Sequence, residues 1–187
     1  MRKIMFNDKC ELTKAVLYGN KTMTRRDAKL FNIKTMEKWD KEISEDYKKW
    51  CIEKLTKYKV GEEVAIAQCY GDCGTWFFPT AEYGHMAGYT NKMFVKADLM
   101  PHHIKITNIR MERLQDISEE DCLKEGIHKV DFALKDRGLY SFRYENEWYN
   151  QYQTAREAFA VLIDKVSGKG TWKSNPWVFV YDFELVD

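Results

Sequence analysis

The final stretch of the chain constrains the fold most strongly, because large apolar side chains occupy every second position there. These residues are Trp177, Phe179, Tyr181, Phe183 and Leu185, and between them lie Val178, Val180, Asp182 and Glu184. A period of two is typical of a strand that turns one face toward a core. The sequence therefore predicts a strand over 177–185 with a buried aromatic face.

Other segments predict a mixture of strands and unlike helices. Strand-like or extended stretches are expected at 3–6, 21–26, 63–70 and 104–114, and helices at 8–18, 36–55, 118–125 and 154–167. Two of these helices follow candidate capping boxes, Ser118–Asp121 and Thr154–Glu157, which satisfy free backbone groups at a helix start. Because a regular strand–helix–strand alternation is missing, we expect one α+β domain over 1–187 with a mainly antiparallel sheet.

The composition favours a protein that binds a ligand in a pocket. Of 187 residues, 44% are hydrophobic and 14% aromatic, enough apolar surface to offset the entropy cost of ordering. The 30 Lys and Arg residues nearly balance the 29 Asp and Glu residues. A domain that grips a duplex through its phosphates usually carries a basic excess.

The start of the chain and its cysteines indicate a cytoplasmic protein. Residues 1–8 meet charges at once and lack the apolar region of a signal peptide. The apolar run at 158–163 is too short to span a membrane. Five scattered cysteines are typical of reduced thiols, so no disulfide framework is expected.

The densest polar cluster follows Gly19, where a glycine would end the first helix. It reads Lys21-Thr22-Met23-Thr24-Arg25-Arg26. One interpretation is an exposed edge strand, whose charges discourage aggregation. The other is a functional site, and both stay open at the level of composition.

This cluster resembles the hallmark of the ASCH family, in which glycine, Lys-Thr, a second threonine and an arginine recur at fixed spacing. The matching residues here are Gly19, Lys21, Thr22, Thr24 and Arg26. Further similarity covers 59–64, the turn at 114–117 with the helix that ends at 125–126, and the closing strand. The resemblance implies a PUA-like β-barrel with flanking helices, with insertions near 27–58, 71–100 and 129–171. It also implies binding of RNA, another nucleic acid or a modified nucleoside in a cleft.

One branch of that family hydrolyses cytidine acylated on its exocyclic amine and uses a lysine, a threonine and a glutamate. By resemblance these roles fall on Lys21, Thr24 and Glu125, with Thr22, Arg25 and Arg26 as ligand-binding residues. A threonine hydroxyl needs a base to become a nucleophile. Lys21 could be that base only if burial or a nearby cation lowers its pKa. Neither a metal nor another cofactor is required.

Strand geometry opposes this set, because alternation places Lys21 and Arg25 on one face and Thr24 and Arg26 on the other. Three hypotheses therefore stay open: a nucleic-acid or nucleoside binding module, an amidohydrolase, and a module that binds a protein partner. An exposed aromatic patch within 71–94 would favour the third. Cys69, Cys73 and His85 lack the further ligands that a zinc site needs, so no metal is expected there.

Overall fold

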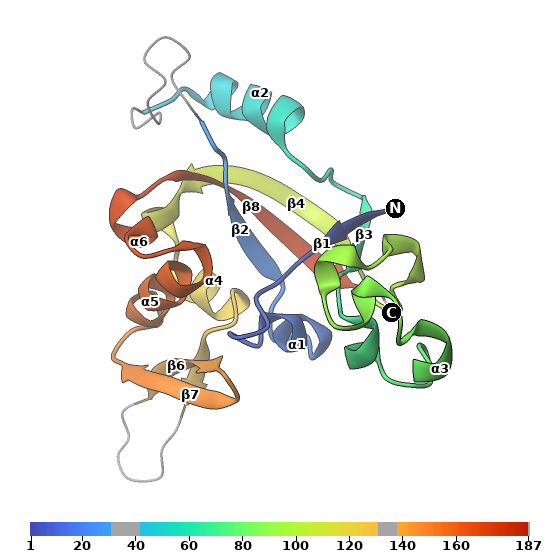
Figure 1. The fold of residues 1–187 in the computed structure, drawn as a ribbon. Coiled ribbons are helices and arrows are strands. Elements are labelled where there is room, and N and C mark those ends of the chain that lie inside the picture. Colours follow the sequence, from blue (N-terminus) through green and yellow to red (C-terminus); the bar gives the residue numbers. More distant parts are fainter. Residues whose placement is uncertain (31–41, 131–137, 187) are drawn as a thin grey trace.

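The C-terminal segment forms a long strand, β8 (Trp177–Leu185), which lies inside a five-stranded sheet beside one edge strand (Figure 1). The computed structural model describes residues 1–30, 42–130 and 138–186. The sheet order is β1-β3-β4-β8-β2, with β1 (Arg2–Ile4), β2 (Met23–Asp27), β3 (Glu63–Ile66) and β4 (His103–Arg113). Only the β1–β3 pair is parallel among these described strands, so the mainly antiparallel sheet is confirmed.

Both faces of β8 are buried over most of its length. The predicted burial of the aromatic face is confirmed, because Trp177, Phe179, Tyr181 and Phe183 are all nearly inaccessible. Val178 and Val180 on the other face are also buried. Helices on both sides of the sheet produce this burial (Figure 1).

Six helices are described, and several begin where the sequence predicts. They are α1 (Leu12–Leu17), α2 (Glu45–Leu55), α3 (Thr80–Tyr83), α4 (Glu119–Lys124), α5 (Ala155–Ser167) and α6 (Thr171–Ser174). The side chain of Ser118 caps α4, and Thr154 with Glu157 forms a complete capping box at α5. Helix α5 ends before Gly168 as predicted.

One predicted helix start was wrong, and the start predicted at residue 36 lies outside the described residues. The first helix begins at Leu12 rather than after Asp8, because Glu11 adopts a left-handed conformation and Asp8 instead accepts a hydrogen bond from Thr13. Helix α2 begins after Ser44, which caps it. The earlier part of the predicted helix, up to residue 41, lies outside the described residues.

A second sheet contains β5 (His128–Val130), β6 (Leu139–Tyr144) and β7 (Glu147–Tyr152), in that order. It lies within the predicted insertion at 129–171 and packs beside α5 (Figure 1). Phe142 of β6 and Phe159 of α5 belong to the main hydrophobic core. This segment is therefore part of the core of the fold.

The segment within 71–100 folds mostly as short 3-10 turns and the small helix α3. A second hydrophobic cluster packs this segment against the end of β3, and its buried members are Ala65, Ala67, Tyr70, Phe78, Val95 and Met100. Trp76, Phe77, Met93 and Phe94 stay exposed, with Trp76 at 91%. Exposed aromatic side chains here are the feature that would favour the protein-partner hypothesis, which stays a prediction.

The described strands do not form a closed barrel. Strands β1 and β2 are the two edges of the five-stranded sheet and do not pair with each other. A side-chain hydrogen bond spans this gap: Nη2 of Arg26, on β2, donates to the backbone carbonyl of Met5, which follows β1, at 2.7 Å. The fold class shown is therefore α+β with an open sheet, and the gap between its edges is where the candidate site lies.

Candidate functional site

Lys21 is held at the entrance to β2 by the turn that ends α1. Gly19 has a φ of 72°, a conformation that favours glycine, and it redirects the chain there. The backbone N–H groups of Asn20 and Lys21 both donate to the carbonyl of Ala15, at 2.8 and 2.9 Å. These bonds fix the backbone of Lys21, whose side chain is only 1% exposed.

Glu125 is placed opposite Lys21 by the end of α4. It is the C-cap residue, and Gly126 follows with a φ of 101°. A Cβ at Gly126 would be strained and would approach Leu12 to 3.1 Å, so glycine suits this turn. An anion at a helix C-terminus opposes the helix dipole, and the cations around Glu125 offset that cost.

Lys21 and Glu125 form a buried ion pair. Nζ of Lys21 donates to Oε2 of Glu125 at 2.5 Å and to its backbone carbonyl at 2.8 Å. Nη1 of Arg25 donates to the other carboxylate oxygen, Oε1, at 3.1 Å. Both oxygens of Glu125 therefore have cationic partners.

Arg25 joins this pair to a second set of charges. Its Nη2 donates to Glu112 at 2.7 Å and to Asp121 at 3.0 Å. Arg110 in turn donates to the same two carboxylates. The side chain of Arg25 donates five hydrogen bonds within the protein, so it is held rigidly and in turn orients Glu125.

The surroundings lower the pKa of Lys21 from its ordinary value. Loss of hydration on burial is the largest cause, and the nearby charges of Arg26 and Arg25 act in the same direction. Glu125 opposes them, because a carboxylate stabilises the ammonium. A lysine with a lowered pKa exchanges its proton more readily near neutral pH.

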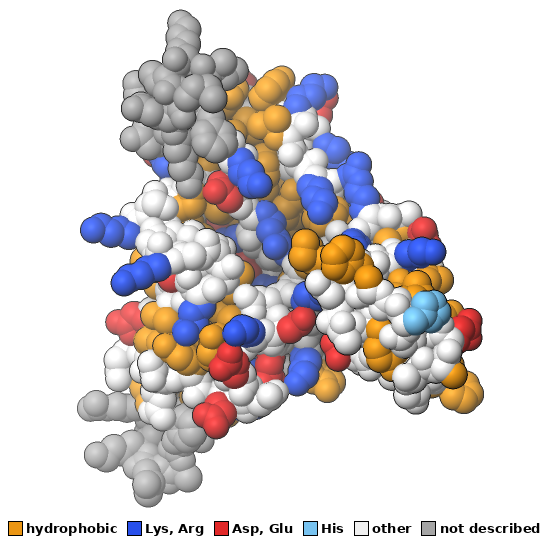
Figure 2. Space-filling model, in the orientation of Figure 1, with side chains coloured by type: hydrophobic (Ala, Val, Ile, Leu, Met, Phe, Trp, Pro, Cys, Tyr) orange, Lys and Arg blue, Asp and Glu red, His pale blue; other side chains and the backbone are white. Residues whose placement is uncertain are grey.

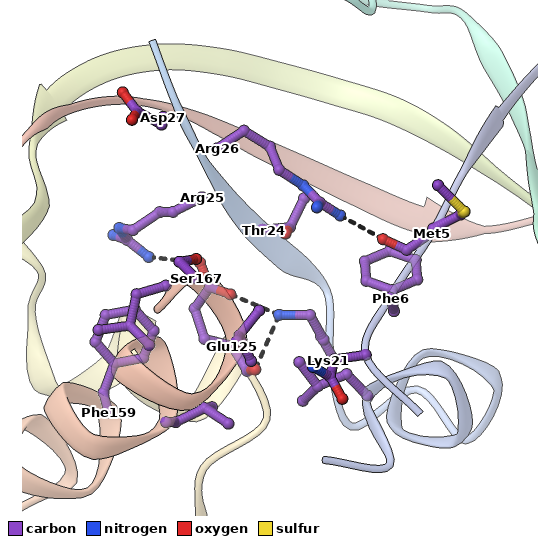
Figure 3. Close-up of a pocket in the computed structure, with 15 residues that line it drawn as sticks. Met5, Phe6, Lys21, Thr24, Arg25, Arg26, Asp27, Glu125, Phe159 and Ser167 are labelled. Carbon is purple, nitrogen blue, oxygen red and sulfur yellow. Dashed lines mark hydrogen bonds and ion pairs between the residues drawn. The ribbon is translucent and has the colours of Figure 1, made fainter. Parts of the chain in front are cut away.

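These side chains border a cavity of about 100 Å³ beside β2 (Figure 3). Lys21, Thr24 and Glu125 all line it, and the side chain of Thr24 projects from β2 into the same space as the other two (Figure 3). Although Thr24 is only 5% exposed, its hydroxyl has no hydrogen-bond partner among the described residues. A ligand in the cavity could therefore bond with it directly.

The position of β2 at the sheet edge explains how side chains from opposite faces of this strand line one cavity. Thr24 pairs with Tyr181 and Arg25 with Val180, so the two side chains do lie on opposite faces. Because no described strand covers the outer edge of β2, a cavity at that edge receives side chains from both faces. Lys21 precedes the strand, which begins at Met23.

Five of the six predicted site residues line the cavity: Lys21, Thr24, Arg25, Arg26 and Glu125. Thr22 does not. Its side chain is exposed, while its backbone N–H donates to the carbonyl of Lys124 and its carbonyl accepts from Phe183. Thr22 therefore links β2 to α4 and β8 through its backbone.

Sequence reasoning missed the apolar wall of the cavity. Helix α5 supplies Phe159, Leu162, Ile163 and Val166, and the segment after β1 supplies Met5 and Phe6. The helical spacing of the α5 residues indicated a core face, which is also true. The sequence carried no signal that one edge of this face borders a cavity.

The described residues contain no cluster of three or more His, Cys, Asp and Glu side chains arranged to hold a metal ion. Cys69 and Cys73 lie at the first turn of the 71–100 segment as free thiols. None of the helices in the described ranges is both long and apolar enough to span a bilayer.

Comparisons of the chain with protein-family models, with curated proteins and with solved structures found no match.

Proposed function

We propose that the chain binds a cytidine-like nucleoside acylated on its exocyclic amine and hydrolyses that amide in the cavity beside β2. One observation carries the proposal: a buried lysine, ion-paired to Glu125, shares a small cavity with a threonine hydroxyl that has no partner among the described residues. A nucleophile, a base with a lowered pKa and a group that orients the base are the components that amide hydrolysis needs.

Lys21 and Thr24 form no hydrogen bond with each other, since among the described residues Nζ of Lys21 donates only to Glu125. In the first step, the neutral amine of Lys21 therefore takes the proton of the Thr24 hydroxyl through one bridging water molecule. Oγ1 of Thr24 then forms a bond to the acyl carbon, and negative charge develops on the acyl oxygen. When the tetrahedral intermediate collapses, the bond from carbon to the exocyclic nitrogen breaks. The Lys21 ammonium returns its proton to that nitrogen, so the free nucleoside leaves and Thr24 carries the acyl group.

In the second step, a water molecule attacks the acyl-threonine. Lys21, again neutral, accepts a proton from the water, and the bond between carbon and Oγ1 breaks. The proton returns to Thr24, and a carboxylic acid leaves. Glu125 orients Lys21 throughout, since it accepts two hydrogen bonds from Nζ.

Arg26 is the residue best suited to stabilise the developing oxyanion. It lines the cavity and donates through Nη2 to the carbonyl of Met5. Its other N–H groups have no hydrogen-bond partner in the described part of the chain, so they can bind a ligand oxygen. A fixed donor aimed at developing charge commonly contributes about 10²–10³-fold in rate.

The resemblance to the ASCH family supports this assignment, and we propose membership of that family. In this proposal the open five-stranded sheet corresponds to a PUA-like barrel that is incomplete between β1 and β2. The position of the cavity at that gap is consistent with a fold in which the opening of the barrel admits the ligand.

The test is incubation of the pure protein with N4-acetylcytidine, with release of cytidine followed by chromatography. Lys21→Ala and Glu125→Gln are each expected to lower kcat by about 10²–10⁴-fold, the usual contribution of a positioned base. No turnover by a protein that circular dichroism shows to be folded would reject this substrate.

Binding of RNA or a nucleoside without hydrolysis is the second candidate. The observation that favours it is the double hydrogen bond from Lys21 to Glu125, which satisfies the ammonium and opposes its action as a base. In that case cytidine and short RNA would bind with no product formed, and Lys21→Ala would weaken the binding.

A further inference from the structure

A second and larger hollow adjoins the catalytic cavity at the gap between β1 and β2. It encloses about 620 Å³ and shares Met5, Arg26 and Asp27 with the smaller cavity. We name it the edge groove; its other lining residues are Ile4, Ala28, Lys29, Leu55, Lys57, Tyr58, Phe179 and Tyr181. On the face shown in Figure 2, Lys and Arg side chains gather around the hollow beneath α2.

The size of the two spaces indicates how a ligand would divide between them. Sites for small molecules usually enclose about 300–1,000 Å³. The cavity beside β2, at about 100 Å³, is too small for a whole nucleoside. If the acyl group and the base edge occupy the cavity, the remainder of the substrate extends into the edge groove.

The edge groove carries an excess of positive charge. Arg26, Lys29 and Lys57 line it, against the single carboxylate of Asp27. The chain as a whole is nearly balanced, so this excess is local. Neither Lys29 nor Lys57 forms an ion pair with any residue of the described ranges, and both side chains are available to an anion.

The floor of the groove offers apolar faces, because its hydroxyl groups already have partners. The hydroxyl of Tyr58 donates to the carbonyl of Lys3 at 2.9 Å. The hydroxyl of Tyr181 accepts from the backbone N–H of Lys57 at 3.2 Å. The ammonium of Lys57 lies 5.1 Å from the centre of the Tyr58 ring. The charged groups that line the groove, three cations and the carboxylate of Asp27, are therefore the polar groups that a ligand would meet.

We propose that the substrate carries a phosphate on its ribose, and that Lys29 and Lys57 bind this phosphate in the edge groove. The inference rests on the proposed function, because it assumes that the acylated base occupies the neighbouring cavity. A free nucleotide and a nucleotide unit within RNA both supply this chemistry.

The experiment compares kcat/KM for N4-acetylcytidine, its 5′-monophosphate, its 3′-monophosphate and a short RNA with one internal N4-acetylcytidine. At least one phosphorylated substrate is expected to exceed the nucleoside by about 10-fold or more, with the advantage shrinking as salt screens the charges. A gain with a monophosphate identifies a nucleotide substrate, and a gain confined to the RNA identifies a polymer. Equal values for all four substrates would overturn the proposal.

The double variant Lys29→Ala/Lys57→Ala should bring the ratio of phosphorylated to unphosphorylated kcat/KM close to one. Lys54→Ala is the matched control, since Lys54 lies on α2 but does not line the edge groove. It should leave the ratio unchanged. A ratio that survives the double variant would overturn the assignment of these cations.

Calorimetric titration with cytidine and its two monophosphates separates this proposal from the proposed function. Tighter binding of a monophosphate without any turnover would reject hydrolysis and retain the phosphate site. Turnover of the nucleoside with no preference for phosphate would retain hydrolysis and reject the phosphate site. Equal affinities for cytidine and both monophosphates, with no turnover, would reject both.

Discussion

Replacement of Lys21 by methionine should destabilise the protein far more than the same replacement of an exposed lysine whose ion pair has an equal N···O distance. Lys21→Met keeps an unbranched side chain of similar length and removes the charge. It leaves the carboxylate of Glu125, whose side chain is 6% exposed, without its closest cation. The backbone carbonyl of the same residue also loses a donor.

The expected loss in the free energy of unfolding is about 3 kcal/mol. Removal of one partner from a buried pair typically costs about 3–5 kcal/mol, because it leaves an uncompensated charge. The low end applies here, since Arg25 still donates to Glu125 at 3.1 Å. In the double variant Lys21→Met/Glu125→Gln the losses should fall short of additivity by about 1–3 kcal/mol. Urea unfolding followed by circular dichroism measures Lys21→Met, Glu125→Gln and the double variant.

Lys54→Met is the matched control, because Nζ of Lys54 also lies 2.5 Å from a carboxylate, that of Glu53, but both side chains are exposed. It should leave the urea midpoint unchanged within error, as for most exposed ion pairs. A loss below about 1 kcal/mol for Lys21→Met, or strict additivity in the double variant, would refute a desolvated pair.

Three further results are expected. The value of kcat/KM should rise with pH up to the lowered pKa of Lys21 and then level off, because the neutral amine is the base. Arg26→Ala removes a charge that lowers this pKa, so the rising limb of the variant's pH profile should lie at higher pH. A rising limb at the wild-type pH would contradict the role of Lys21. Burial raises the pKa of the Cys122 thiol to about 12, so a thiol reagent at pH 8 should label Cys122 in the native protein on the order of 10³-fold more slowly than in urea, and rapid native labelling would contradict this burial. Thr154→Ala removes the cap of α5, in which Oγ1 accepts from the N–H of Glu157 at 3.1 Å, and should cost about 1 kcal/mol in urea unfolding; no loss would show that α5 is held without it.

Segments with strong local signals were predicted well from the sequence. The period of two in β8 and the capping box of α5 each depend on neighbouring residues alone, and the structure confirms both. The left-handed turn at Gly19 is likewise predictable from the residues around it. Such features need no knowledge of distant contacts.

The second sheet was missed because its turn has an unusual sequence. Strands β6 and β7 are joined by Glu145 and Asn146, which have φ angles of 49° and 70°. Two positive φ angles in a two-residue hairpin are typical of a type I′ turn, for which Asn-Gly is the usual signal. Glutamate at the first position gives no such signal, so the sequence predicts no hairpin here.

The meeting of Lys21 with Glu125 could not be derived from the sequence alone, since 104 positions separate them. The family resemblance named both residues, but composition and periodicity gave no reason to pair them. Nor could strand alternation place Lys21 and Thr24 around one cavity. That depends on β2 being the edge strand of the sheet, a property set by the order of all five strands.

The role of the Thr24 hydroxyl is the central claim, and cytidine release from N4-acetylcytidine by Thr24→Ala and Thr24→Ser tests it most directly. The alanine variant should lose at least about 10³-fold in kcat, as expected when a nucleophile is removed, whereas serine, which keeps a hydroxyl, should retain measurable turnover. Thr22→Ala alters an exposed side chain outside the cavity and should match the wild type. Turnover by folded Thr24→Ala at the wild-type rate would contradict the account.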